Sequence, residues 1–226
     1  MPPRIYFAGV NQHNFCETFR GFHVLESFAD VRALLDRYRP LFASMILDSG
    51  AFSAMNSGRV IALEEYADFA LKHRSAYNWC ASLDSIDGGV EANLTNWKRL
   101  EALGLSSVPT FHQGEPWWLL DAYLGATDRI GLGFQRPIVN ARAWLTECFS
   151  RIPAGFKVHG WAMTNYTDLP FESVDSTTWL FEMKGLLAVK PGQGGEVISC
   201  LTQREVLELI QKKYERWPKR QASLSD

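Results

Sequence analysis

The sequence predicts an α/β protein of the (β/α)8 TIM-barrel class, formed as a single domain without a zinc subdomain. Short apolar segments rich in β-branched and aromatic residues alternate with longer segments of helical periodicity, which is typical of parallel βα units. Eight such units fit within 226 residues, a length that suits a compact barrel. No Gly-x-Gly-x-x-Gly motif follows the first predicted strand, which favours the barrel over a doubly wound open sheet.

Each predicted strand is a short apolar run bounded by polar or turn-forming residues. In chain order, the strands are predicted at Arg4–Val10, Met45–Ser49, Asn78–Asp84, Ser107–His112, Arg129–Phe134, Lys157–Met163, Glu172–Asp175 and Leu186–Lys190. The sequence therefore supplies the strand number that a (β/α)8 barrel requires.

Helices are predicted between these strands from their 3.6-residue apolar periodicity. The clearest are Leu63–His73, Val90–Leu103, Trp117–Leu124, Ala141–Ile152 and Arg204–Trp217. Asp30 before Val31–Tyr38 and Thr202 before the last helix are expected N-caps, because their side-chain oxygens can accept from otherwise unpaired amides. Pro218 is expected to end the last helix.

Composition and charge limit the domain organisations and the binding partners that can be expected. With 46% hydrophobic and 21% charged residues, the chain is ordinary for a globular protein. Residues 1–217 are expected to form the barrel, and residues 218–226 a polar C-terminal tail. A formal net charge of −2 gives no overall attraction to polyanions, so contact with nucleic acid would need a local basic surface.

The cysteines show no spacing typical of a metal site. Cys16, Cys80, Cys148 and Cys200 form no CxxC or Cys/His pattern, and the chain shows neither a signal-peptide segment nor an apolar run of the ~20 residues that a membrane helix needs. We therefore expect a reduced, cytoplasmic protein with no metal, no cofactor and no membrane partner.

Polar residues end several of the predicted strands. Because parallel barrel strands are buried, such a residue is costly unless it faces the mouth formed by the βα loops. The positions are Asp48, Asp84, His112 with Gln113, His159 and Asp175, and Gly131 and Gly133 leave backbone without side chains at another strand end.

These positions also have structural alternatives. An aspartate such as Asp84 or Asp175 can cap the helix that follows it. The histidines can be satisfied core residues, and the glycines can serve only as turn formers. Three carboxylates at the same end of separate strands nevertheless favour a shared site, because caps can sit on solvated loops instead.

The order and spacing of these segments resemble the tRNA-guanine transglycosylase family, and most closely its short relatives that insert 7-deazaguanine bases into phage and bacterial DNA. The resemblance runs from about Ile46 to Trp179. Its motifs are Asp48–Phe52, Asp84, Phe111–Gly114, Ile130–Gly133, and Val158–Gly160 followed by Ser173–Ser176.

The resemblance implies two catalytic carboxylates. Asp175 would be the nucleophile that attacks C1′ of the sugar, and Asp48 would be the general acid/base near the leaving base. Phe52 would stack on the base, while Asp84 and Gln113 would read its hydrogen-bonding edge.

Further residues of the matching motifs would complete the base pocket. Gly131, Leu132 and Gly133 would form a backbone site, His112 would orient Asp84 or Gln113, and His159 would lie in the substrate pocket. Trp117 and Trp118 are candidates for an aromatic wedge that turns a nucleotide out of the stack, with core packing as the alternative.

The chain also departs from the family pattern. It lacks the Cys/His zinc insertion of the tRNA-acting members, and Ala51, Ser53 and Thr177–Trp179 replace a glycine, a glutamine and arginines. We therefore expect DNA, rather than tRNA, and a free 7-deazaguanine (preQ0-type) base as the partners, with a homodimer or a partner protein supplying any missing basic surface.

Other functions are compatible with the same residues. A tRNA-acting transglycosylase or a barrel enzyme that hydrolyses nucleosides would use the same carboxylates. A non-catalytic subunit that binds bases or nucleic acid would have no need of two opposed carboxylates. A metal-dependent hydrolase would draw on Asp48, Asp84, His112 and His159, which lack a compact ligand motif.

Overall fold

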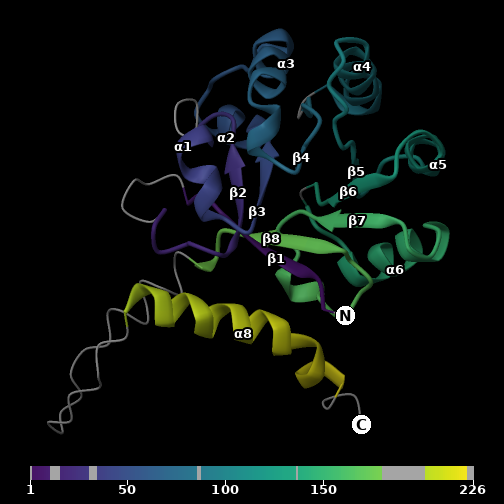
Figure 1. Ribbon diagram of the computed structural model, residues 1–226. Helices are drawn as coiled ribbons and strands as arrows, with labels where there is room; N and C mark the ends of the chain where they lie inside the picture. The colour runs from purple at the N-terminus through teal and green to yellow at the C-terminus, as the bar shows by residue number, and fades with distance from the viewer. Residues whose placement is uncertain are drawn as a thin grey trace, which may run out of the picture.

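The centre of the molecule is one parallel sheet of eight strands, as seen in the computed structural model (Figure 1). The structure describes residues 2–10, 16–30, 35–85, 88–135, 137–179 and 202–222. The strands are β1 (Arg4–Ala8), β2 (His23–Ser27), β3 (Ser44–Asp48), β4 (Trp79–Cys80), β5 (Thr110–His112), β6 (Arg129–Gly133), β7 (Lys157–Gly160) and β8 (Ser173–Ser176). Every strand pair given for this sheet is parallel.

Helices lie around the outer side of this sheet, with α8 beside the β1 and β8 strands (Figure 1). The α-helices are α1 (Leu35–Tyr38), α2 (Ala51–Asn56), α3 (Leu63–Lys72), α4 (Gly89–Ala102), α5 (Trp117–Ala126), α6 (Ala141–Arg151) and α8 (Gln203–Ala222). Short 3-10 helices occupy Arg39–Leu41, Arg74–Ala76 and Thr164–Tyr166. The fold is therefore mixed α/β, with helices packed on a curled parallel sheet.

The two edge strands of the sheet are neighbours in the sequence. The strand order is β4-β3-β2-β1-β8-β7-β6-β5, so the curl of the sheet brings β4 towards β5. A parallel bridge joins Ala81 to Val108, where the Val108 N–H donates to the Cys80 carbonyl and the Ser82 N–H to the Val108 carbonyl, both at 2.8 Å. One isolated bridge thus links the segments beside β4 and β5, and no ladder pairs these two strands among the described residues.

Seven of the predicted strand segments overlap observed strands, but β2 was not predicted. His23, Glu26 and Ser27 interrupt its short apolar run, so its alternation is hard to read in the sequence. The predicted strand Leu186–Lys190 lies outside the described residues. The sheet nevertheless contains eight strands, because β2 stands between β1 and β3.

The predicted helices correspond to α3, α4, α5, α6 and α8. Thr202 caps α8 as expected, because its hydroxyl accepts from the Glu205 N–H while the Glu205 carboxylate accepts from the Thr202 N–H at 2.7 Å. The predicted end at Pro218 is wrong, since α8 continues to Ala222. A proline removes one hydrogen bond from a helix and can bend it without ending it.

Two apolar clusters lie on opposite sides of the sheet. The larger cluster packs alternate strand residues, such as Phe7, Leu47 and Val174, against the helices. The smaller one, formed by Tyr6, Ala8, Leu25 and Ile46 with Trp79 and Trp161, fills the inside of the curl. Side chains alternate along a strand, so every second residue points to the same side of the sheet. The residues that follow the smaller cluster towards the carboxyl ends of the strands therefore also point to the inside of the curl.

Cys16, Cys80 and Cys148 are free and buried, and Cys200 lies outside the described residues. Within the described part of the chain, no helix combines the length and the apolar character needed to cross a membrane.

Candidate active site

The carboxyl ends of the strands bring three acidic side chains into one electrostatic neighbourhood. Asp48 ends β3, Asp175 lies in β8, and Asp84 follows β4. Burial raises the pKa of Asp48 to about 7, the Gly50 N–H opposes this rise, and the charges of Asp175 and Asp84 add to it. Because Asp48, Asp84 and Asp175 lie at or just after the carboxyl ends of parallel strands, they occupy the same edge of the curled sheet.

Asp175 is held through one of its two oxygens. The side chain is nearly buried, and the Ala162 N–H donates to Oδ1 at 2.9 Å. The His159 ring nitrogen Nε2 lies 3.3 Å from the same oxygen. Both of these contacts fall on Oδ1, and Oδ2 accepts no hydrogen bond from the described residues.

The turn that holds Asp175 contains a strained residue. Ala162 has φ 55°, in the left-handed region that non-glycine residues rarely adopt. This conformation costs about 1–2 kcal/mol for an L-residue with a Cβ. Strain retained beside a buried carboxylate is typical of functional sites, where the surrounding structure fixes one geometry.

His159 lies beneath Asp175, where its side chain has no solvent exposure. Its Nδ1 is 2.8 Å from the Ser173 hydroxyl, and its ring packs edge-on against Trp161 and Trp79, with centroids 4.5 and 5.1 Å away. β7 directs His159 into the interior of the sheet, and its contact with a substrate stays a prediction. From there its Nε2 contacts Asp175 Oδ1 and holds that carboxyl group in place.

Asp48 belongs to a tight turn that only glycine can complete. The Gly50 N–H donates to Asp48 Oδ2 at 3.0 Å, and Gly50 has φ 77°. A Cβ at this position would lie 2.6 Å from the Ser27 hydroxyl oxygen and 2.9 Å from the Ala29 backbone nitrogen. Phe52, two residues later on α2, is 62% exposed and is free to meet a ligand.

A second polar group surrounds His112. Its Nε2 lies 3.5 Å from Asp84 Oδ2, and its Nδ1 lies 3.6 Å from Glu115 Oε1. The His112 backbone N–H also donates to Glu115 Oε2 at 2.7 Å. The sequence did not point to Glu115, although its position three residues after His112 was the available signal.

The pKa values in this group reflect both burial and charge. Burial raises the pKa of Asp84 to about 6, the Glu115 charge adds to the rise, and His112 opposes it. For His112, burial lowers the pKa, but Glu115 and Asp84 outweigh that effect and the net pKa is raised. The cluster therefore favours a charged imidazole between two carboxyl groups.

Gln113 ties two loops together and leaves one buried acceptor. Its side-chain amide donates to the Val139 carbonyl, and its backbone N–H donates to the Gly133 carbonyl at 3.0 Å. Its Oε1 is buried without a hydrogen-bond partner among the described residues. A buried unpaired oxygen is costly, so a ligand that donates a hydrogen bond there would be stabilised.

The Gly131–Gly133 segment lies in β6, and its role as a backbone site for the base stays a prediction. The Gly131 N–H already donates to the Pro109 carbonyl at 2.9 Å, and a Cβ at Gly131 would lie 2.3 Å from Trp161 Nε1. Leu132 is fully buried in the cluster between sheet and helices. The absence of a side chain at Gly131 and Gly133 thus makes room for Trp161 and His112, respectively. Because side chains alternate along a strand, Leu132 points to the opposite face of the sheet, towards the helices.

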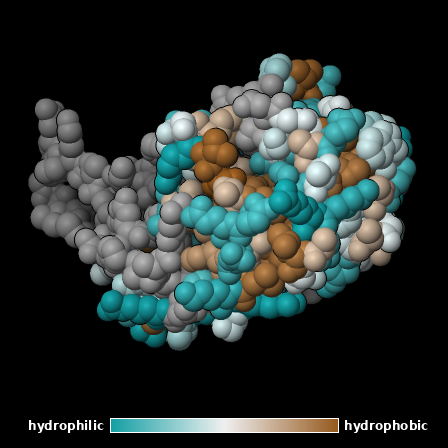
Figure 2. Space-filling view, turned by 90° about the horizontal axis from the view of Figure 1, so that it is seen from above, coloured by the Kyte–Doolittle hydropathy of each residue, from teal (hydrophilic) through white to brown (hydrophobic). Residues whose placement is uncertain are grey.

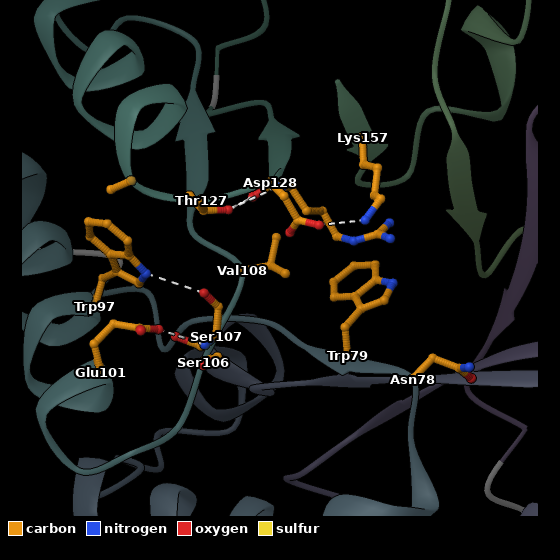
Figure 3. A pocket seen from close by; sticks show the side chains of 12 residues that line it. Asn78, Trp79, Trp97, Glu101, Ser106, Ser107, Val108, Thr127, Asp128 and Lys157 are labelled. Carbon is orange, nitrogen blue, oxygen red and sulfur yellow. Dashed lines mark hydrogen bonds and ion pairs between the residues drawn. The ribbon is translucent and has the colours of Figure 1, made fainter. Parts of the chain in front are cut away.

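A cavity of about 420 Å³ lies at the opposite, amino-terminal end of the strands (Figure 3). Three of its charged groups form ion pairs: Lys157 donates to Asp128 at 2.5 Å, and Arg129 pairs with Glu172. Glu101 instead accepts a hydrogen bond from the Ser107 N–H at 3.0 Å. Figure 3 shows Asp128 and Lys157 turned towards each other, with Trp79 and Trp97 on either side of Val108. We assign no catalytic role to this cavity, because its ion pairs neutralise most of its charges and it is remote from Asp48 and Asp175.

Exposed apolar side chains are scattered on the surface. Figure 2 shows hydrophobic side chains in separate patches divided by hydrophilic ones. Phe52 and Trp118, 62% and 52% exposed, follow strand ends at the mouth, whereas Trp117 packs on the core. Core packing therefore accounts for Trp117, and Trp118 stays available as a wedge.

No family model matches the chain, and no curated protein matches it significantly. Among the described residues, no group of three or more His, Cys, Asp or Glu side chains is placed to hold a metal ion.

Proposed function

We propose that this protein exchanges a guanine base in DNA for a 7-deazaguanine through a covalent bond between Asp175 and the sugar. The observation that carries the proposal is that Asp48 at the end of β3 and Asp175 in β8 lie at the carboxyl ends of one curled parallel sheet, where His159 and the Ala162 N–H hold Asp175 Oδ1. Burial raises the pKa of Asp48, and the charge of Asp175 adds to that rise. Two carboxyl groups with different environments are what a retaining exchange at a glycosidic carbon requires.

The first step forms one bond and breaks another. Asp175 Oδ2 attacks C1′, and the bond from C1′ to N9 of guanine breaks with its electron pair leaving on the base. Asp48 gives its proton to the departing guanine. Since burial raises the pKa of Asp48 to about 7, a substantial fraction of Asp48 carries this proton near neutral pH.

The second step reverses the first with a different base. N9 of the 7-deazaguanine attacks C1′, and the bond between C1′ and Asp175 breaks, which restores the carboxylate. The ionised Asp48 takes the N9 proton of the incoming base. His159 and the Ala162 N–H both contact Oδ1 of Asp175, so they keep its side chain in one orientation for both steps.

Base recognition would use groups on the neighbouring strands. Asp84 and the unpaired Gln113 Oε1 would accept hydrogen bonds from the base, and the exposed Phe52 ring would stack on its face. We also propose that the sheet is a closed (β/α)8 barrel, supported by the bridge between Ala81 and Val108. Closure would place all these groups around one mouth.

A second candidate is favoured by the charge of the mouth. The acidic side chains there are Asp48, Asp84, Glu115 and Asp175, and the basic side chain that lies next to them is His112. Such a mouth suits a neutral nucleoside better than a phosphodiester chain. Cleavage of a free nucleoside by the same two carboxylates is therefore the alternative activity.

The test is transfer of labelled 7-deazaguanine into a guanine-containing oligonucleotide, single-stranded or duplex, with guanosine and deoxyguanosine in parallel. We expect label in DNA, with loss of transfer in Asp175→Asn. Asp128→Asn is the matched control, because Asp128 is exposed at the opposite end of the strands. Base release from free nucleosides without transfer to DNA would support the second candidate instead.

A further inference from the structure

The side chain of His112 lies between two carboxyl groups that come from different segments. Nε2 faces Asp84 after β4, and Nδ1 faces Glu115 after β5, at 3.5 and 3.6 Å. A neutral imidazole can donate a proton from only one nitrogen, and its other nitrogen would then direct a lone pair at a carboxylate oxygen. The imidazolium form directs an N–H group towards each carboxyl group, at ion-pair distances rather than in short hydrogen bonds, and Nδ1 has no hydrogen-bond partner among the described residues.

Glu115 is itself firmly held. Its side chain is nearly buried, Oε2 accepts from the His112 backbone N–H at 2.7 Å, and Oε1 lies 3.5 Å from the Asn93 side-chain amide nitrogen, which donates to it. A buried carboxylate is costly unless it is paired with charge or hydrogen bonds. These hydrogen bonds therefore hold the Glu115 carboxyl group against the ring of His112, on the side away from Asp84.

We propose that His112, held by Glu115, is a positioning residue that keeps Asp84 oriented and ionised to bind the hydrogen-bond-donating edge of a purine-type base. The inference rests on the proposed function, which places the base against Asp84. An ionised aspartate can accept from two neighbouring N–H groups, such as the ring N1–H and the exocyclic amine of guanine, whereas a protonated one loses an acceptor. His112 thereby sets the preference for bases that carry both donors.

Other charged and titratable groups around Asp84 and His112 bear on the same equilibrium. Asp48 lies near enough to Asp84 for their charges to interact, and Tyr123 of α5 faces Asp84 and Glu115, whose charges add to the rise in its pKa caused by burial. Gly133 of β6 admits the His112 ring, because a Cβ there would lie 2.8 Å from it. Of these groups, His112 is the one that can supply a positive charge to Asp84.

The experiment measures equilibrium binding of free 7-deazaguanine by calorimetry between pH 5 and 8. In the wild-type protein, affinity should fall as the pH drops through about 6, the pKa of Asp84. In His112→Gln, Asp84 loses its cation, so the pH of half-maximal affinity should rise by ~1 unit and the affinity at pH 7 should fall. Discrimination against an analogue without the exocyclic amine should weaken as well.

His73→Gln is the matched control, because His73 caps α3 and lies outside the cluster. If His112→Gln does not fold, the isosteric variant Asp84→Asn provides a second test. The affinity of this variant for free 7-deazaguanine should no longer change between pH 5 and 7. A pH profile identical to that of the wild-type protein, in either variant, overturns the inference. Binding that follows these expectations without any base exchange would retain the inference and reject the proposed transglycosylase activity.

Discussion

The Nε2 atom of His159 lies 3.3 Å from the Oδ1 atom of Asp175, deep in the interior of the sheet. A carboxylate can only accept, so Nε2 carries the proton of this contact, and Nδ1 then accepts from the Ser173 hydroxyl at 2.8 Å. This relationship fixes both the orientation of Asp175 and the tautomer of His159.

The first prediction concerns His159→Gln. The variant should lower the turnover number of base exchange by about 100-fold, because a carboxylate displaced by a fraction of an ångström no longer aligns with C1′. The affinity for free 7-deazaguanine should stay within about twofold of wild type, since His159 has no exposed surface. Steady-state kinetics and calorimetry measure the two quantities, and a loss of affinity as large as the loss of turnover would contradict this assignment.

The second prediction concerns the two half-reactions, which should depend on pH in opposite directions. Asp48 must be protonated to release guanine, so the rate of adduct formation should fall as the pH rises through about 7. It must be ionised to accept the incoming base, so the rate of adduct resolution should fall below that pH. Single-turnover measurements from pH 5.5 to 8.5 separate these steps, and rates that do not change with pH would remove Asp48 from this role.

The third prediction compares two glycines in the left-handed region. Gly50→Ala should destabilise the protein by about 2 kcal/mol or more, because its Cβ would meet the Ala29 backbone nitrogen at 2.9 Å and the turn would also be strained. Gly58→Ala should cost only about 1 kcal/mol, since nothing lies within 4 Å of a Cβ there. Urea unfolding measures both values, and equal losses would show that crowding at Gly50 is unimportant.

The fourth prediction concerns Glu26, a buried carboxyl group of β2. Burial, aided by the Asp30 charge and opposed by the Val10 N–H, raises its pKa to about 8 from its ordinary value of 4.5. Between these pH values, the unfolded chain ionises while the folded protein keeps its proton, so the contribution of Glu26 to stability is full below 4.5 and decreases as the pH rises towards 8.

Glu26→Gln should therefore be more stable than wild type at pH 8.5 by about 1 kcal/mol or more. At pH 4.5 the two proteins should be nearly equal in stability. The free energy of unfolding in guanidinium chloride at both pH values checks this sign. A variant that is less stable than wild type at pH 8.5 would contradict it.

The sequence predicted most of the sheet, because apolar segments and polar strand ends alternate clearly along it. It did not predict β2, since His23 and Glu26 make HVLES read as a polar surface segment. Glu26 is in fact buried, at 3% exposure, and such a position follows from the tertiary fold alone. The end of α8 was misplaced because Pro218 was treated as a terminator.

The sequence predicted polar side chains at the ends of several strands, and their membership of one site stays a prediction. Period-two alternation already places Leu132 on the face opposite Gly131 and Gly133, and it could have excluded the Leu132 side chain from the mouth. The sequence left open whether His159 is a core residue, because its burial depends on packing against Trp79 of β4 and Trp161 after β7. Glu115 was overlooked because it lies in a turn after a strand rather than at the strand end.

The central claim is that Asp175 forms a bond to C1′ of a guanosine nucleotide. The most direct measurement is intact-protein mass spectrometry after incubation with a guanine-containing oligonucleotide and no incoming base, followed by peptide mapping. The claim predicts an adduct equal in mass to the oligonucleotide without its guanine, attached to the peptide that contains Asp175 and absent from Asp175→Asn. Base exchange without any adduct, or an adduct that persists in Asp175→Asn, would contradict it.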